Sequence, residues 1–196
     1  MTKNPKLTEK MLVFLYCLSQ MDSKVNINTF RRYIYLYYMT KAFFEDSETD
    51  DVVIAVEKGT VKILGFDDIL NTLQLQDYIE IDGNFILINK SLKDYVEKLV
   101  LNGAVLFDIY KQINPFVNLL KSYDDQFIFT IFFSEPTYTR ATQGAETEIT
   151  PLQSQLSKLL KEFKKKIAND RIDNYDILSH WMDFILRNYY TATGEE

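Results

Sequence analysis

The stretch YIEIDGNFILI, residues 78–88, places the dipeptide Asp82-Gly83 between two runs rich in isoleucine and aromatic residues. Asp-Gly between such runs is a strong hairpin signal, because both central residues of the turn tolerate a positive φ. We therefore predict a β-hairpin with strands at 78–81 and 84–88.

A second hairpin is expected upstream. Residues 52–56 and 60–64 are rich in β-branched residues, and Gly59 lies in the short connection between them, where a positive φ is needed. Between the two hairpins, apolar residues at helical spacing predict a short helix that continues to about Gln76, with Asp67 or Asp68 as its expected cap.

Two helices are expected before the hairpins. Residues 7–21 carry apolar residues at helical spacing, with Thr8 as the expected cap. The second helix runs from about 28 to 44, with Asn26 or Asn28 as its cap. Apolar and aromatic residues lie nearly all round this second helix, which is typical of a helix in the core.

The second half of the chain is expected to be mostly helical, with helices at 91–101, 105–122, 151–168 and from about 174 onward. Residues 124–133 are a short aromatic run in which helix and strand are not separable by pattern, and the potential cap Asp124 favours helix. Residues 134–150 are polar and rich in threonine, and we interpret them as a long loop.

The composition excludes several kinds of site. The chain of 196 residues has one cysteine and one histidine, so it cannot form an internal disulfide or a zinc site of Cys and His ligands by itself. It has no P-loop, dinucleotide-binding glycine motif or nucleophile elbow. We therefore expect no enzyme activity, no cofactor and no metal. Without a long apolar run, no membrane partner is expected, and we expect a cytoplasmic location.

Charge is unevenly distributed along the chain. Residues 1–44 have a net charge of +5, residues 45–110 of −9, and the whole chain of −6. A protein that binds nucleic acid through its own phosphate contacts usually has a basic domain, which this sequence lacks. The candidate nucleic-acid contacts are confined to one predicted helix and are Lys161, Lys164, Lys165 and Lys166.

Aromatic residues make up 14% of the chain, more than we expect a core alone to need. Aromatic side chains are enriched at protein interfaces, where they provide a large contact area at small entropic cost. The surplus of aromatic residues and the absence of a catalytic motif favour the interpretation that this chain is a subunit that binds another protein. The candidate partner-binding residues are Tyr33, Tyr37, Tyr38, Phe129, Phe132 and Phe133.

Helix, helix, short helix and tight hairpin follow one another in the order of a winged helix. The segments LTEKMLVFLYCLSQM, NINTFRRYIYLYYMT and LQLQDYIEIDGNFILIN resemble the small middle components of bacterial ABC three-component systems, including accessory subunits of Lamassu-type anti-phage defence. The resemblance covers about residues 7–100. The predicted fold class is α+β, mainly helical. We expect a winged-helix-like unit with two β-hairpins at 1–103 and a helical part at 104–196 packed on it, and a single compact unit is the alternative.

The resemblance implies a non-catalytic subunit that binds an SMC-like or ABC-type ATPase and couples DNA sensing to an effector nuclease. It implies contact with DNA only indirectly or jointly with partners. One alternative is a winged-helix transcription regulator, although the helix that would read DNA offers Asn71, Gln74 and Gln76 and no basic residue. The other is an enzyme with an unrecognised site at Asp176, His180 and Asp183, which share one helix face.

Overall fold

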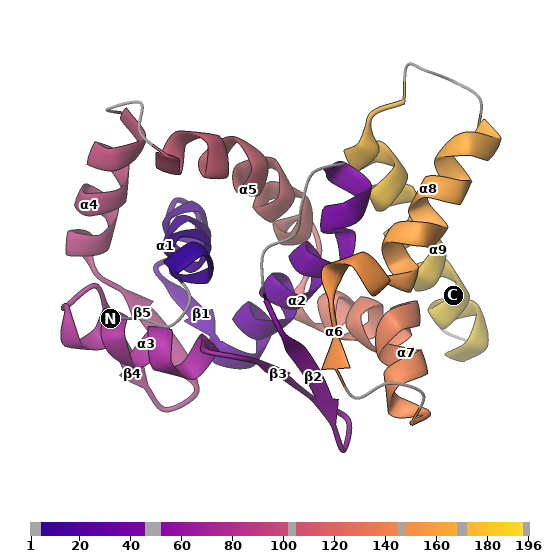
Figure 1. Ribbon diagram of the computed structural model, residues 1–196, viewed down its shortest axis with the longest axis horizontal. Coiled ribbons are helices and arrows are strands. Elements are labelled where there is room, and N and C mark those ends of the chain that lie inside the picture. The colour runs from indigo at the N-terminus through magenta and orange to yellow at the C-terminus, as the bar shows by residue number, and fades with distance from the viewer. Residues whose placement is uncertain (1–4, 46–51, 102–104, 145–147, 168–171, 194–196) are drawn as a thin grey trace.

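Helix α2 (Ile27–Phe44) runs through the middle of the molecule in the computed structural model, which describes residues 5–45, 52–101, 105–144, 148–167 and 172–193 (Figure 1). The side-chain oxygen of Asn26 accepts hydrogen bonds from the first turn, so the predicted cap at this residue is confirmed. Most side chains of α2 are buried, including Phe30, Tyr33 and Tyr35. The prediction of a helix in the core is therefore confirmed.

The N-terminal part consists of α2 together with all other elements from α1 to α4. They are α1 (Pro5–Ser19), β1 (Lys24–Asn26), β2 (Ile54–Glu57), β3 (Thr60–Ile63), α3 (Phe66–Leu75), β4 (Ile79–Asp82), β5 (Phe85–Ile88) and α4 (Lys90–Leu101). Thr8 lies inside α1, so the predicted cap of this helix is wrong. The short helix and both predicted hairpins are present. Asp67 and Asp68 lie within the first turn of α3, and the residue before the helix is Gly65, so the predicted aspartate cap is wrong.

One antiparallel sheet has the strand order β1-β5-β4. Asp82 pairs with Phe85, so the two turn residues are Gly83 and Asn84, one position later than the sequence predicts. Gly83 has a φ of +57°, the left-handed conformation that glycine adopts without strain. Strand β1 was not predicted, because its three residues are too short for a periodic pattern.

The remaining elements are α5 (Val105–Lys121), α6 (Asp125–Ser134), α7 (Pro136–Thr142), β6 (Glu148–Ile149), a 3-10 turn η1 (Pro151–Gln153), α8 (Gln155–Ile167) and α9 (Asn174–Thr193). Asp124 caps α6 by accepting a hydrogen bond of 2.8 Å from the amide of Phe127, and the preferred helix is confirmed. The predicted loop at 134–150 is wrong, because α7 and β6 lie within it. Residues 145–147 lie outside the described residues.

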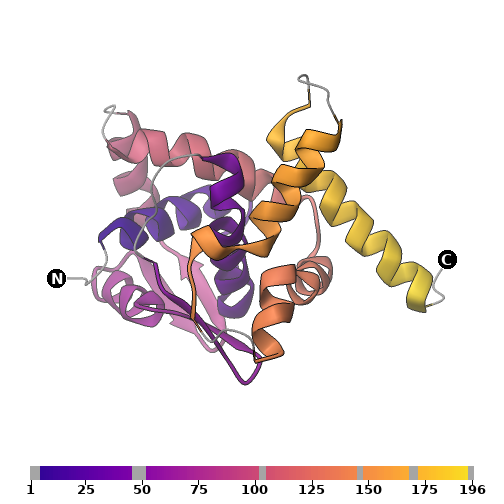
Figure 2. The same cartoon turned by 45° about the vertical axis from the view of Figure 1, so that its right-hand side comes forward.

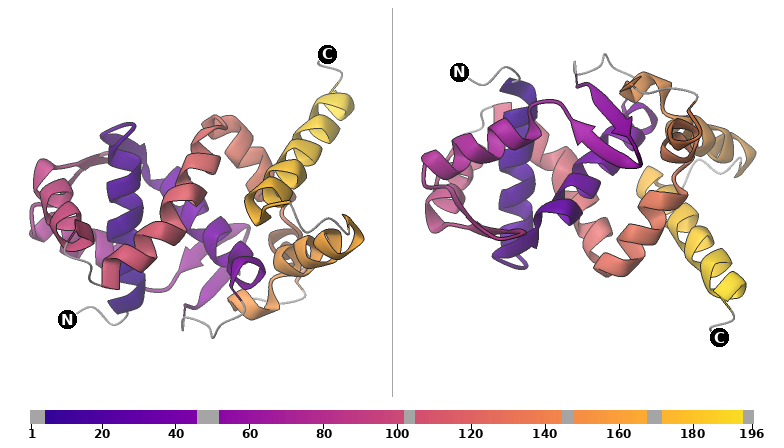
Figure 3. Two further views of the ribbon diagram at one scale, coloured as in Figure 1. Left: turned by 90° about the horizontal axis from the view of Figure 1, so that it is seen from above. Right: turned by 90° about the horizontal axis from the view of Figure 1, so that it is seen from below.

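Strand β6 adds to the upstream hairpin, so that the second antiparallel sheet has the order β3-β2-β6. Helices α1 and α4 lie at one end of the molecule, and α8 and α9 lie at the other, with α2 between them (Figure 3). Helix α9 points away from the rest of the chain toward its C-terminal end (Figure 2). Buried side chains from both parts form one hydrophobic cluster, which crosses the boundary predicted at 103/104.

Together these elements form a mainly helical α+β fold with two small antiparallel sheets, as the sequence predicts.

Candidate functional site: a groove beside strand β3

Two adjoining hollows of about 390 Å³ and 240 Å³ lie beside strand β3, and they share Arg31, Thr60 and Val61 in their walls. We call them together the β3 groove. The larger hollow is within the size range of ligand pockets. The groove is lined on one side by Asn28, Arg31 and Arg32 of α2, along its length by residues 59–65, and at its ends by Asp67, Asp68, Phe132 and Phe133.

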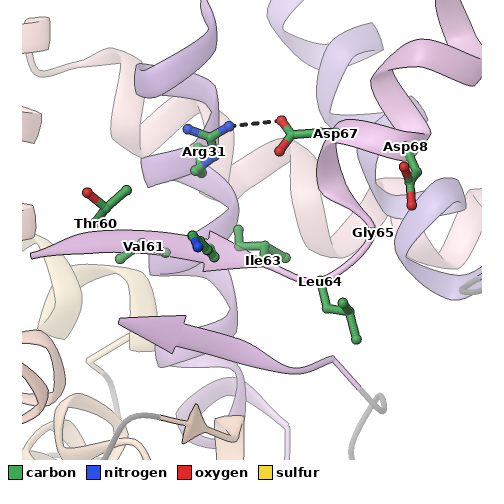
Figure 4. Close-up of a pocket in the computed structure, with 9 residues that line it drawn as sticks. Arg31, Thr60, Val61, Ile63, Leu64, Gly65, Asp67 and Asp68 are labelled. Carbon is green, nitrogen blue, oxygen red and sulfur yellow. Dashed lines mark hydrogen bonds and ion pairs between the residues drawn. The ribbon is translucent and has the colours of Figure 1, made fainter. Parts of the chain in front are cut away.

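The groove follows the unpaired edge of β3. Figure 4 shows β3 between β2 on one side and the Arg31–Asp67 pair on the other. The amide of Leu64 donates to the carbonyl of Val53, and in an antiparallel pair hydrogen-bonded residues alternate with residues whose backbone groups point away. The N–H and C=O groups of Val61 and Ile63 therefore face the groove. Among the described residues, none hydrogen-bonds to these backbone groups.

Arg31 is held in place by neighbouring groups. Its guanidinium donates at 3.0 Å to the carboxylate of Asp67 and at 3.1 Å to the side-chain oxygen of Asn28, and it lies 4.9 Å from the ring centre of Phe66. The Asp67 side chain is 77% exposed, so this ion pair contributes little stability, about 0–1 kcal/mol. Its effect is to fix the wall between α2 and α3.

Arg32 has a different environment. Its half-buried guanidinium lies 4.8 Å from the ring centre of Phe129 and 5.9 Å from that of Phe132. Within the described residues it makes no hydrogen bond or ion pair. Burial lowers the pKa of Arg32, and the carboxylate of Asp125 acts in the opposite direction. Arg32 is thus a partly desolvated cation that faces a groove and stacks on rings only.

Aromatic rings of α6 and α7 form the wall next to Arg32. The ring centres of Phe129 and Phe133 are 4.4 Å apart, and Phe133 also contacts Phe132 and Tyr138. Phe129 is 45% exposed and Phe133 is 41% exposed, so the two rings in contact share a surface that is open to solvent. We call these two residues the aromatic pair. A pair of exposed rings beside a groove is typical of an interaction site.

The predicted partner-binding residues separate into two groups. Phe129 and Phe133 lie at the surface, as an interface requires. Tyr33, Tyr37 and Tyr38 are at most 5% exposed and pack in the core, so their assignment to an interface is wrong for this folded chain. Phe132 is 4% exposed, but its ring lines the β3 groove. The pattern of aromatic residues did not separate them, because α2 is buried on nearly every side.

The lysines predicted to contact nucleic acid lie on α8, away from the groove. Lys164, Lys165 and Lys166 are exposed, and Lys161 is half-buried. Lys164 donates at 2.6 Å to the side-chain oxygen of Asn174. Exposed lysines near the C-terminal end of a helix are also stabilised by the helix dipole.

The candidate catalytic face on α9 does not form a convergent site. Asp183 accepts a hydrogen bond of 2.8 Å from the hydroxyl of Tyr123, and Asp176 accepts one from the amide of Asp173. His180 is exposed. Within the part of the chain that the structure describes, no three His, Cys, Asp or Glu residues are arranged to hold a metal ion.

A second unusual cluster surrounds Lys10, which is only 5% exposed. Its ammonium lies 5.5 Å and 5.3 Å from the ring centres of Tyr37 and Tyr38, whose buried hydroxyls have no hydrogen-bond partner in the described ranges of the chain. Burial, followed by the positive charge of Lys41, lowers the pKa of Lys10 to about 7. The cluster lies among α1 and α2 and lines no described hollow, so it bears on stability rather than on binding.

Sequence reasoning missed the groove and Arg32. The signal in the sequence was the pair Arg31-Arg32, two adjacent charges on an otherwise aromatic helix. It also missed the acceptor Glu135, although Glu followed by Pro and Thr is a helix-start pattern.

Comparisons with protein-family models, with curated proteins and with solved structures give no match to this chain. Among the described residues, every helix is too short or too polar to cross a membrane.

Proposed function

We propose that this protein is a non-catalytic accessory subunit that binds an SMC-like or ABC-type ATPase. In this proposal the ATPase complex senses DNA, and the subunit helps couple that sensing to an effector nuclease in anti-phage defence. The observation that carries the docking role is the aromatic pair, Phe129 and Phe133, exposed beside a groove that contains Arg32, a cation that forms no ion pair with another described residue. Interface centres are enriched in aromatic and arginine side chains.

The order of elements supports a winged-helix-like N-terminal part. Helices α1, α2 and α3 precede the β4–β5 hairpin, and β1 completes a three-stranded sheet with that hairpin. The hairpin β2–β3 is inserted between α2 and α3. Because this insertion forms the β3 groove, the departure from the simple winged helix is also the feature that favours protein binding.

In this winged-helix-like interpretation α3 is the helix that would read DNA, and its chemistry opposes that use. Its first turn carries Asp67 and Asp68, and its last residue, Leu75, is 89% exposed. Acidic residues repel phosphate, and this helix has no basic residue to contact it. A protein contact therefore fits this unit better than direct DNA recognition.

Affinity purification of the tagged chain from its native host, followed by mass spectrometry, tests the proposal. Co-purification of a stoichiometric SMC-like ATPase is the expected result. A chain that emerges alone and monodisperse contradicts it.

The second candidate is a DNA-binding regulator, which the exposed lysines of α8 favour. Its test is the binding of the isolated chain to duplex DNA across a range of salt concentrations. A regulator binds with an affinity that falls steeply with salt and depends on Lys164, Lys165 and Lys166. An accessory subunit that touches DNA only jointly with its partners shows no such binding.

A further inference from the structure

We infer that the β3 groove binds an extended segment of a partner protein, which adds to β3 as a further strand and places a carboxylate against Arg32. This inference deepens the proposed function and rests on its premise that the chain docks onto another protein. It names the surface, the binding mode and the chemistry of the bound segment.

The backbone of β3 supplies the first argument. Val61 and Ile63 present two N–H and two C=O groups toward the groove, in the spacing that a neighbouring strand requires. Natural sheets commonly protect such an edge with a covering element, a bulge or a proline. Here the edge is left open to a groove, which is how peptide-binding domains that use strand addition are built.

The charges along the groove supply the second argument. The guanidinium of Arg32 lies at the end near Gly59, and the carboxylate of Asp68 lies at the end near Gly65. Asp68 forms no ion pair with another described residue. Between them, Arg31 is paired with Asp67 and Lys62 is paired with Glu57. The complementary segment therefore carries an acidic side chain at the Arg32 end and a basic side chain about four residues away, at the Asp68 end.

The aromatic pair supplies the third argument. Phe129 already stacks on Arg32, and Phe133 lines the same hollow. Rings around a charge pair exclude water from it, and a carboxylate that binds there forms a charge-assisted bond in a partly dry environment. The same rings offer apolar contact to alternate side chains of the added strand.

The test uses the full chain and a library of random 12-residue peptides displayed on phage. We expect the selected peptides to combine β-branched residues with an acidic residue. A selected peptide, made with a fluorescent label, should bind the chain about tenfold more weakly when its Glu or Asp is changed to Gln or Asn. The substitution Arg32→Gln in the protein should cause a similar loss.

Lys111→Gln is the matched control, because Lys111 also stacks on an exposed phenyl ring, that of Phe107, but lies on α5. It should leave peptide binding unchanged. Hydrogen exchange measured by NMR gives a second readout that needs no variant. Peptide binding should slow exchange of the Val61 and Ile63 amides about tenfold or more, because both become hydrogen-bonded.

The inference is overturned if no peptide is enriched, or if the enriched peptides bind equally well without their carboxylate. It is also overturned if Arg32→Gln and Lys111→Gln bind the peptide equally well, or if the Val61 and Ile63 amides exchange at the same rate with and without peptide. Its failure is distinguishable from failure of the proposed function. If an ATPase co-purifies but the Val61 and Ile63 amides remain unprotected, only the strand-addition mode is contradicted. If a peptide binds as expected but no ATPase co-purifies from the host, only the identity of the proposed partner is contradicted.

Discussion

The hydroxyl of Tyr35 donates a hydrogen bond of 2.6 Å to the Oε2 atom of Glu135, although the two residues are 100 positions apart in the sequence. Glu135 is fully buried, and its carboxylate also accepts bonds from the amides of Thr137 and Tyr138 and from the hydroxyl of Thr137. Tyr138 in turn donates at 2.7 Å to the carbonyl of Gly59. The central helix α2 is thus linked through α7 to the tip of the hairpin that forms the groove.

The Tyr35–Glu135 hydrogen bond predicts that substitutions of its donor and of its acceptor lower the free energy of unfolding by unequal amounts. Tyr35→Phe removes one of four donors and should lower the free energy of unfolding by about 1 kcal/mol. Glu135→Ala leaves buried donors unpaired and removes the cap of α7, so it should cost about 3 kcal/mol. Urea denaturation of both variants measures these values. Equal costs, or no cost for Glu135→Ala, would show that the link is not a stabilising element.

Tyr38→Phe is the matched comparison on the same helix. Tyr38 is as fully buried as Tyr35, but its hydroxyl has no hydrogen-bond partner among the residues that the structure describes. Burying an unpaired hydroxyl is unfavourable, so its removal should leave stability unchanged or raise it by about 1 kcal/mol. The same denaturation assay tests this. A loss as large as that of Tyr35→Phe would mean that the hydroxyl of Tyr38 has a partner in solution.

The buried Lys10 predicts a dependence of stability on pH. Its pKa is about 7 in the folded chain and 10.5 as the ordinary value, so the unfolded state binds more protons between these two pH values. The contribution of Lys10 to stability therefore rises with pH across this window, by up to about 1.4 kcal/mol per pH unit. Denaturation at several pH values from 7 to 9.5 measures the slope.

Lys10→Met is the variant that isolates this effect. It removes the ionisable group, so it should flatten the slope and raise stability most at pH 7. The range stops at 9.5 because burial also raises the pKa of Tyr37 and Tyr38, which opposes the trend at higher pH. An unchanged slope in Lys10→Met would contradict the assignment to Lys10.

The aromatic side chains of α6 predict a separation between binding and stability. Phe133→Ser changes an exposed ring and should alter the free energy of unfolding by less than about 1 kcal/mol, while reducing capture of the partner. Phe132→Ala creates a cavity at a side chain that is 4% exposed and also lines the groove, so it should cost about 3 kcal/mol or more and reduce capture as well. Denaturation and partner capture, measured on both variants, separate the two roles. Normal capture by Phe133→Ser would exclude that ring from the interface.

Much of the fold could be predicted from local patterns. The hairpin at 78–88 carries its own turn chemistry, and α2 shows its burial in apolar residues on every side. Strands β1 and β6 were missed because they are three and two residues long and are stabilised by pairing with distant strands. Such pairing leaves no local signal.

The candidate site was predicted only in part, because its parts come from separate segments. Phe129 and Phe133 were predicted to bind a partner because they are aromatic. Tyr33, Tyr37 and Tyr38 were predicted for the same reason, but they are buried in the core. The exposure of an aromatic side chain depends on tertiary packing, which cannot be read from composition. The groove needs an open strand edge next to Arg32, and this arrangement exists only once β3 packs against α2.

In the proposed complex, a partner ATPase docks at the groove and its aromatic pair. Replacing Phe129 with the photo-crosslinking residue p-benzoylphenylalanine, in the native host, tests it most directly. The same replacement at Phe107, an exposed ring on α5, is the control. The account predicts that illumination links an SMC-like ATPase to position 129 and not to position 107. Crosslinking of the ATPase from position 107 alone, or from neither position, would contradict it.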